Sequence, residues 1–212
     1  MSDAPSLRAL QHPRFARFYL RLSEAAERYG MAELRDRLLT GLTGRIVELG
    51  CGNGLNFAHY PATVTEVLAI EPDDVLRERA GRSAAEASVP VTVISGQGDA
   101  LPADDESFDA AVACLVLCSV SKQASTLAEL RRMLRPGGEL RVLEHVRSAR
   151  PVLGRLQDLV SPPWQRAFGG CHPNRDTLAA IEAAGFSVRE SERFGFGPRP
   201  FTTAHILGRA ER

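Results

Sequence analysis

The stretch Ile46–Phe57, IVELGCGNGLNF, decides the fold of this chain. It opens with an apolar run that contains Glu48, and it then places glycines at alternate positions, Gly50, Gly52 and Gly54. Alternate glycines carry no side chain that would keep a ligand away, and they permit backbone angles that other residues resist. The pattern predicts a buried strand, a bare loop and a helix start, which is where α/β folds commonly bind a nucleotide-like ligand.

Strand-like and helix-like segments alternate after this point. We expect strands at residues 45–50, 66–71, 89–95, 108–117 and 138–146. We expect helices at residues 15–30, 31–41, 73–87, 121–134 and 175–186, and a further helix that begins at residues 55–60. Residues 187–194 and 202–210 are typical of a closing antiparallel pair. The sequence therefore predicts an α/β fold: a Rossmann-like, doubly wound, seven-stranded and mostly parallel sheet with an antiparallel last strand.

Two parts of the chain fall outside this rhythm. Residues 1–43 predict an N-terminal helical cap or lid, because two amphipathic segments each end at a glycine. Residues 44–212 form the predicted Rossmann-like domain. Within it, residues 147–174 contain prolines and glycines beside one helical segment, so we expect a substrate-shaping insertion over the site.

The composition of the 212 residues excludes several classes of protein. With 44% hydrophobic residues, 25% charged residues and no formal net charge, the chain lacks the basic footprint of a nucleic-acid partner. Its longest apolar stretch, residues 110–120, is too short to span a bilayer, and the N-terminus does not resemble a signal peptide. The four cysteines therefore need not form disulfides. We predict a cytoplasmic monomer or homodimer without a transmembrane segment.

The residues around the glycine loop indicate what it binds. GCGNG lacks the G-x-G-x-x-G spacing that seats a pyrophosphate, and no lysine follows it as in a P-loop, so a ligand without polyphosphate is expected. About twenty residues further on, Glu71 ends a strand and is suited to accept hydrogen bonds from both hydroxyls of a ribose. Asp99 could accept from an adenine amino group, with Leu101 packed on the ring.

Five motifs then resemble one family. VELGCGNG, IEPD, GDALP, FDAAVA and LRPGGELRVLEHV, in this order over residues 44–146, are similar to the class I S-adenosylmethionine-dependent methyltransferases of the small-molecule type. The resemblance implies that the loop glycines line the methionine part of S-adenosylmethionine, that Glu71 holds the ribose, and that Asp99 with Ala100 frames the adenine. The predicted cofactor-binding residues are Glu48, Gly50, Cys51, Gly52, Gly54, Asn56, Glu71, Pro72, Gly98, Asp99, Ala100, Leu101, Cys114 and Leu115.

A second resemblance is narrower. CLVLCSV, LEHV, NRDT, AAGF and HILGRA look like the branch that contains animal membrane-associated thiol methyltransferases. Those relatives carry a hydrophobic N-terminal anchor that this sequence lacks, and they tend to have Asp where Glu71 stands. The resemblance implies methyl transfer to a small molecule, with a thiol as the first choice of acceptor. The alternatives are N- or O-methylation of a lipid head group or metabolite, a cofactor-binding protein without transfer, and a nicotinamide-dependent oxidoreductase, which the loop spacing disfavours.

The acceptor side of the site is expected at the end of the fifth strand. His145 lies there, either as the base that takes the acceptor's proton or as an orienting hydrogen-bond partner. Aromatic residues of the cap and the insertion would exclude water, although an amphipathic helix also needs aromatics for packing. The predicted substrate-binding residues are Phe15, Tyr19, Val116, His145, Trp164, Phe168 and Cys171.

Several of these residues have a structural alternative. Glu48 could cap the loop amides, and Asp99 could be a turn residue. Cys114 and Cys118 lie four residues apart, which suggests a site that binds a metal or arsenic. Buried cysteines, however, are more often part of the hydrophobic core. No histidine is near them in sequence and the spacing is not C-x-x-C, so we predict no metal. Cys171 beside His172 is interpreted as a pocket-shaping loop residue, and His205 as a core histidine.

Overall fold

The computed structural model describes residues 7–198 and 202–212, and a single seven-stranded sheet runs through them. Its strands are β1 (Gly44–Leu49), β2 (Val64–Ile70), β3 (Val91–Ile94), β4 (Phe108–Cys114), β5 (Leu134–His145), β6 (Ser187–Phe196) and β7 (Thr203–Glu211). Their order is β3-β2-β1-β4-β5-β7-β6, with β7 antiparallel to both of its neighbours. The predicted fold is confirmed.

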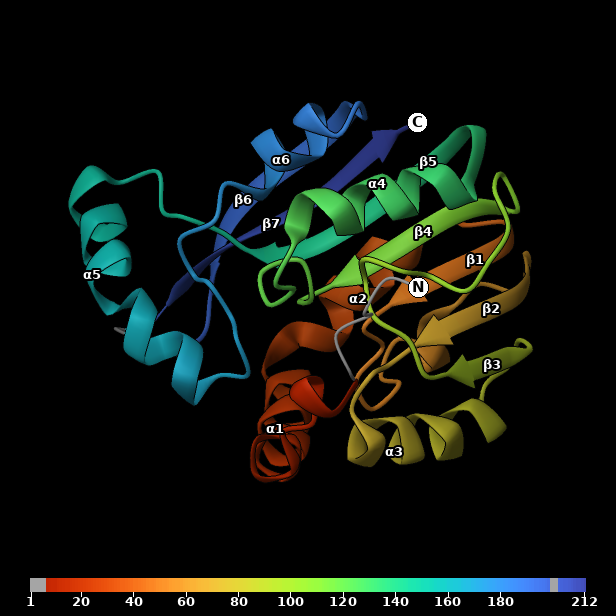
Figure 1. Cartoon of the computed structure of the whole chain (residues 1–212), viewed down its shortest axis with the longest axis horizontal. Coiled ribbons are helices and arrows are strands. Elements are labelled where there is room, and N and C mark those ends of the chain that lie inside the picture. The colour runs from red at the N-terminus through yellow and green to blue at the C-terminus, as the bar shows by residue number, and fades with distance from the viewer. Residues whose placement is uncertain (1–6, 199–201) are drawn as a thin grey trace.

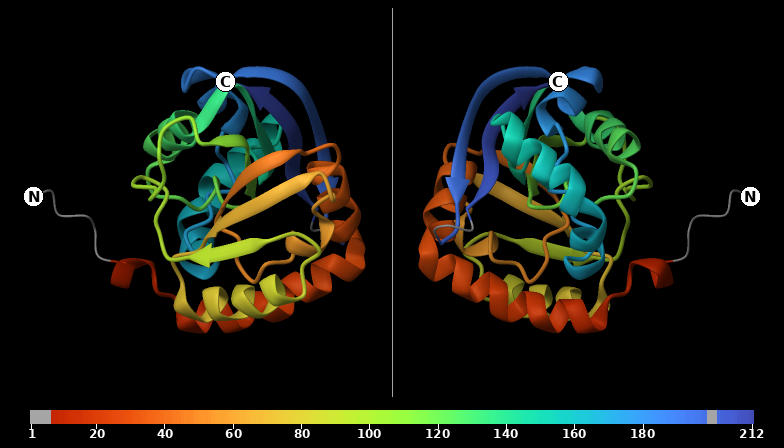
Figure 2. Two further views of the ribbon diagram at one scale, coloured as in Figure 1. Left: turned by 90° about the vertical axis from the view of Figure 1, so that its right-hand side faces the viewer. Right: turned by 90° about the vertical axis from the view of Figure 1, so that its left-hand side faces the viewer.

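Helices cover both faces of this sheet (Figure 1). They are α1 (Pro13–Ala26), α2 (Ala32–Leu39), α3 (Asp74–Ala85), α4 (Gln123–Met133), α5 (Pro151–Ala167) and α6 (Thr177–Ala183), with the short turns η1 (Leu7–Leu10), η2 (Glu27–Met31) and η3 (Phe57–His59). Helices α4 and α6 pack on one face, and α2 and α3 pack on the other. Helix α1 lies beside α3, outside the sheet (Figure 2).

The alternation of side chains along β1 explains the two cores. Ile46 joins the cluster under α2, whereas Val47 joins the cluster under α4, because successive side chains of a strand point to opposite faces. Both are fully buried, as a parallel strand with helices on both sides requires. The glycine loop follows directly, so it lies at the carboxyl edge of the sheet, where such folds bind ligands.

Several elements differ from their predicted bounds; the fifth strand, for example, begins at Leu134 and not at residue 138. Two of the differences lie next to the glycine loop. The helix expected from residue 55 is only the short turn η3, because Gly52 and Gly54 adopt positive φ angles of 57° and 78° and prolong the loop. The strand expected through residue 117 ends at Cys114, because Leu115 adopts a φ of 57° and turns the chain out of the sheet.

The N-terminal segment divides into two parts. Residues 1–6 of the predicted cap lie outside the described residues. Gly30, with a φ of 107°, marks a kink between α1 and α2. Helix α2 buries Leu34, Leu38 and Leu39 against the sheet, so it belongs to the core, while α1 is free to lie over the glycine loop. No helix in residues 7–198 or 202–212 has the length and apolar character needed to cross a membrane.

Candidate active site

The glycine loop is built so that side chains would not fit. Gly50 has a φ of 62°, and a Cβ there would lie 2.3 Å from Cγ2 of Val116. A Cβ at Gly54 would lie 2.6 Å from the ring of Phe57. The loop is fixed to the end of β2, because the amides of Gly50 and Cys51 both donate to the carbonyl oxygen of Ile70. The backbone is therefore bare and held in place at the sheet edge.

Glu71 reaches this loop from the end of β2, as the sequence predicts. Its carboxylate is 5% exposed and accepts hydrogen bonds from the amides of Gly52 and Asp73, both at 2.9 Å. Burial raises the pKa of Glu71 to about 7, although these two hydrogen bonds oppose the shift. Each carboxylate oxygen keeps a further lone pair, so the group still has acceptor capacity for ribose hydroxyls.

The first residues before α1 are fastened to the same corner. Nε2 of Gln11 donates to the carbonyl oxygen of Pro72 at 2.8 Å, and Oε1 of Gln11 accepts from the amide of Asp74 at 3.0 Å. The amide of His12 donates to Oδ2 of Asp73 at 2.9 Å. This contact, which we call the N-terminal clip, lies next to Glu71 and fastens the start of α1 to the end of β2.

Glu48 and Asn56 lie beneath the loop in a buried network. Glu48 is 1% exposed and accepts from Nδ2 of Asn56 at 2.8 Å and from the hydroxyl of Tyr60 at 2.7 Å. Arg35 donates to Oδ1 of Asn56 at 2.6 Å and to Sγ of Cys114 at 3.3 Å. These contacts give Glu48 and Asn56 a role in positioning the loop, and their contact with the cofactor stays a prediction.

Sequence reasoning missed Arg35, because an arginine within an amphipathic helix looks like a surface residue. Here it is buried and pairs with Glu27 at 2.9 Å. Its pKa is raised, because the attraction of Cys114, Glu27 and Tyr19 outweighs burial.

The residues predicted to frame adenine follow β3. Asp99 accepts from Nζ of Lys122 at 2.9 Å, and its side chain is mostly buried. A Cβ at Gly98 would lie 2.7 Å from Oγ1 of Thr126, so this glycine permits close packing on α4. Leu101 is buried and its amide donates to Glu129 at 3.1 Å. In the structure Asp99 faces Lys122, and its adenine role stays a prediction, as does that of Ala100.

The turn after β4 lies on the side of the site where we expect the acceptor. Glu144 is fully buried and accepts three amide hydrogen bonds, from Val116 at 2.9 Å, Leu117 at 2.7 Å and Cys118 at 3.1 Å. Leu115 precedes these residues at the point where the chain leaves the sheet. Sequence reasoning missed Glu144. A carboxylate next to His145 at the end of a strand could have indicated that it lies at the site.

Three polar side chains meet above this turn. Nδ1 of His145 lies 3.9 Å from Sγ of Cys118 and 3.8 Å from Sγ of Cys171, and the two sulfur atoms are 3.6 Å apart. Because the residues come from the turn after β4, the end of β5 and the loop after α5, their sequence spacing does not reveal the cluster. The ring of His205 packs on His145 at 4.3 Å, as a buried core histidine.

The aromatic residues predicted for the lid come from both α1 and α5. Trp164 and Phe168 stack at 4.1 Å, and Phe15 lies 5.9 Å from Tyr19. The ring of Phe15 also closes on Gly169, where a Cβ would lie 2.5 Å from it. Tyr19 lies close to the glycine loop. A Cβ at Gly52 would be 3.3 Å from the hydroxyl of Tyr19.

A hollow of about 530 Å³ opens between these two segments. It is lined by Gln11, His12, Pro13, Arg14, Phe15, Phe18, Arg166 and Ala167. The N-terminal clip and the end of α5 thus share one open surface next to the site.

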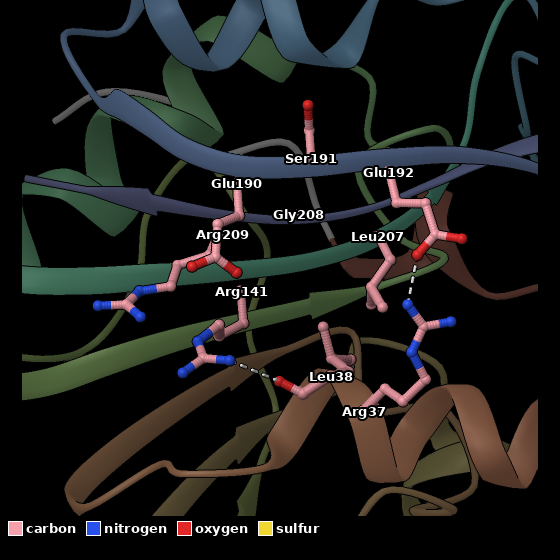
Figure 3. A pocket seen from close by; sticks show the side chains of 9 residues that line it. All are labelled: Arg37, Leu38, Arg141, Glu190, Ser191, Glu192, Leu207, Gly208 and Arg209. Atoms are coloured by element: carbon pink, nitrogen blue, oxygen red, sulfur yellow. Dashed lines mark hydrogen bonds and ion pairs between the residues drawn. The ribbon is translucent and has the colours of Figure 1, made fainter.

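A second hollow, of about 220 Å³, lies between α2, β6 and β7 (Figure 3). Among its charged side chains, Arg37 pairs with Glu192, whereas Arg141 and Arg209 pair with Glu139 outside the lining. Arg141 also donates to the carbonyl oxygen of Leu38. None of its lining residues is a predicted site residue. They are Arg37, Leu38, Arg141, Glu190, Ser191, Glu192, Leu207, Gly208 and Arg209. We therefore place the active site at the glycine loop.

The glycine loop and Glu71 fit S-adenosylmethionine, because a loop of glycines with positive φ follows β1 at the carboxyl edge of the sheet and a buried carboxylate that suits a ribose follows β2. Known proteins agree. A family model described as a methyltransferase domain matches residues 47–142. The solved structure of geranyl diphosphate methyltransferase in complex with GPP and sinefungin has the same fold, with a TM-score of 0.69 at 17% identity over 86% of this chain and 77% of that chain. The fold and site thus define an S-adenosylmethionine-dependent methyltransferase.

Similarity to curated proteins gives a more specific assignment within the methyltransferases. Thiol S-methyltransferase TMT1B of Rattus norvegicus is 32% identical over 203 residues, which is 92% of this chain and 81% of the relative. The Homo sapiens protein of the same name is 35% identical over 182 residues, 81% of this chain and 73% of the relative. The chain belongs to the methyltransferase family that includes these thiol S-methyltransferases, which confirms both resemblances seen in the sequence.

Proposed function

We propose that this enzyme transfers the methyl group of S-adenosylmethionine to the sulfur of a small-molecule thiol. The observation that carries the proposal is the extent of the similarity to the rat thiol S-methyltransferase, at 92% of this chain. An alignment of that extent reaches beyond the methyltransferase domain at residues 47–142 into the cap and the insertion. Those are the segments from which we expect the acceptor to be chosen.

When bound, S-adenosylmethionine supplies an electrophilic methyl group on a sulfonium. The residues of the chain then have three tasks. Glu71 and the glycine loop hold the cofactor, while Phe15 and Trp164 help to exclude water from the reacting atoms. The turn at residues 115–118 orients the acceptor, since most of the acceleration comes from aligning the sulfur with the methyl group.

The remaining task is to remove the acceptor's proton, because the thiolate is the nucleophile. We propose His145 for this step, with an orienting hydrogen bond as its alternative role. The test is the pH dependence of kcat/KM for His145→Ala. If His145 is the proton acceptor, the acidic limb of the profile should shift or disappear in the variant. An unchanged profile would contradict this role.

The acceptor class is tested by offering a thiol, an amine and a phenol side by side. We expect the thiol to be methylated at least about tenfold faster than the others, because a thiolate forms near neutral pH and needs no strong base. A faster amine or phenol would contradict the proposal in favour of N- or O-methylation. Formation of no methylated product with any of the three, despite tight cofactor binding, would favour a binding protein.

We further propose that the enzyme works in the cytoplasm as a monomer or homodimer, with no nucleic-acid partner. The absence of net charge supports the last point. Within the predicted N-terminal cap, we assign the lid role to α1, because the N-terminal clip and Phe15 attach it to opposite sides of the site. Light scattering of the purified protein tests the oligomeric state.

A further inference from the structure

Cys118, His145 and Cys171 form a cluster of three metal-ligating side chains. Their donor atoms, two sulfurs and one ring nitrogen, all lie within 4.8 Å of one another. The separations are 3.6 Å between the sulfurs and 3.8 Å and 3.9 Å from Nδ1 to each sulfur. Such a set combines soft thiolate and imidazole donors, which favour zinc over hard cations.

The separations can be compared with those of a tetrahedral zinc site. With Zn–S bonds of about 2.3 Å and Zn–N bonds of about 2.0 Å, tetrahedral angles place two sulfurs about 3.8 Å apart and a sulfur about 3.5 Å from a nitrogen. The cluster matches the first distance within about 0.2 Å and the second within about 0.4 Å. Small rotations of the side chains would therefore close it around an ion.

The backbone that carries these donors is already held in place. The amide of Cys118 donates to buried Glu144, and its carbonyl oxygen accepts from the amide of His172 at 2.8 Å. The amide of Cys171 donates to the carbonyl oxygen of Phe168 at 3.0 Å. Three elements of the fold thus present their donors to one point before any ion binds, which lowers the ordering cost of binding.

Indole nitrogen Nε1 of Trp164 is a further polar group at the edge of the cluster. It is buried and finds no hydrogen-bond acceptor among the described residues. It lies near Cys171, on the helix that precedes the cysteine's loop. Metal-bound thiolates commonly receive such second-shell hydrogen bonds, which a neutral thiol accepts only weakly.

We propose that Cys118, His145 and Cys171 bind a zinc ion whose fourth position takes the sulfur of the acceptor thiol. Three protein ligands with one open position are typical of catalytic zinc sites, and Cys₂His is one of the donor sets that form them. The binding site follows from the cluster alone. Its use in catalysis rests on the proposed thiol methylation.

The step that this arrangement supports is balanced without a further reagent. A thiol that binds the ion loses its proton to solvent, because a coordinating thiol is deprotonated. Its sulfur then forms a bond to the methyl carbon while the bond from that carbon to the sulfonium breaks. The electron pair of the broken bond stays on the leaving sulfur, and the products are a thioether, S-adenosylhomocysteine and the released proton.

This inference assigns a different task to His145. As a zinc ligand it would not act as the direct proton acceptor, so the two roles exclude each other and metal analysis chooses between them. It also departs from the sequence-based prediction of no metal. That prediction rested on the absence of a histidine near the cysteines in sequence, whereas the fold brings His145 to them.

The experiment measures zinc per chain in the full-length protein, prepared without chelators and then titrated with zinc alone. We expect about one equivalent in the wild type. We expect about 100-fold weaker binding in Cys118→Ser, Cys171→Ser and His145→Gln, because each removes one of three ligands. Cys114→Ser is the matched control, since it removes a buried cysteine that is not part of the cluster, and it should bind zinc like the wild type. Circular dichroism verifies that each variant is folded.

A cobalt-loaded wild-type protein provides a readout that depends on no variant. Two thiolates should give an intense sulfur-to-cobalt charge-transfer band, and a thiol acceptor should change the visible spectrum while an amine does not. No zinc or cobalt binding to the wild type, or undiminished binding to the three variants, would overturn the metal site. A visible spectrum that does not change when the thiol is added would overturn the proposal that the acceptor binds at the open position.

The two proposals fail in distinguishable ways. Zinc binding with no thioether product in the acceptor panel removes the thiol methyltransferase function and leaves the metal site. Thioether formation by a zinc-free enzyme removes the catalytic role of the zinc and returns the proton to His145, whereas the metal site itself is decided by the binding titrations.

Discussion

Glu71 is the residue that we propose to hold the ribose of the cofactor. It is a buried carboxylate with a pKa raised to about 7, and the amides of Gly52 and Asp73 already use part of its acceptor capacity. Protonation converts one oxygen into a donor, so the group can no longer accept from both ribose hydroxyls. On this proposal, the ionised form of Glu71 is the form that binds the cofactor.

The affinity for S-adenosylhomocysteine should depend on pH for this reason. With a pKa near 7, roughly a tenth of Glu71 is ionised at pH 6 and most of it at pH 8, so affinity should be about tenfold weaker at pH 6. Calorimetric titration measures it. Glu71→Gln is the control, because it should bind weakly at both values with no such slope. Equal wild-type affinity at pH 6 and pH 8 would contradict the assignment.

At the scale of elements, α2 connects the core to the glycine loop through Arg35. This side chain is 6% exposed and links Glu27 to Asn56, which in turn binds Glu48. Arg37, two residues along the same helix, is half exposed and pairs with Glu192 at the surface. The two arginines form a matched pair of one buried and one exposed ionic contact.

Replacing each arginine by methionine should give very different results. Arg35→Met leaves buried polar partners without their cation, so we expect the free energy of unfolding to fall by about 3–5 kcal/mol. Arg37→Met removes a surface ion pair and should cost less than about 1 kcal/mol. Urea denaturation measures both. Similar losses for the two variants would show that Arg35 has no special structural role.

If the N-terminal clip holds α1 over the site, loss of the clip should speed up dissociation of the ligand. Gln11→Ala removes two hydrogen bonds, to Pro72 and from Asp74, that fasten α1 over the site. Two such bonds contribute about 1–3 kcal/mol together, so S-adenosylhomocysteine should dissociate about tenfold faster. Stopped-flow measurements give this rate, and Arg21→Ala should leave it unchanged, because Arg21 is exposed on α1 and its side chain makes no hydrogen bond or ion pair with the described residues. An unaltered rate in Gln11→Ala would mean that α1 does not gate the ligand.

At the scale of the whole molecule, the sheet is what the sequence predicts best. Most strands have a local apolar pattern, and the glycine loop with Glu71 fixes where β1 and β2 end. The cluster of Cys118, His145 and Cys171 could not be predicted in the same way. Its members lie on three elements, and only the packing of the loop after α5 onto the sheet edge brings them together.

Helix α5 shows a second limit of sequence reasoning. The insertion at residues 147–174 was expected to shape the substrate site, and this interpretation stays a prediction. The aromatic side chains near the end of α5 lie beside the site, but its first half exposes an apolar ridge. The ridge residues are Val152, Leu153, Leu156, Leu159 and Val160. An apolar periodicity alone does not say which part of a helix is covered.

Transfer of an isotopically labelled methyl group tests the central claim most directly. The enzyme is incubated with S-adenosylmethionine that carries three deuteriums on its methyl group and with a small thiol, and the products are analysed by mass spectrometry. The account predicts a thioether that carries all three deuteriums on its sulfur-bound methyl group, one S-adenosylhomocysteine for each thioether, and little product from Glu71→Ala. Label on nitrogen, oxygen or carbon, or no labelled product, would contradict it.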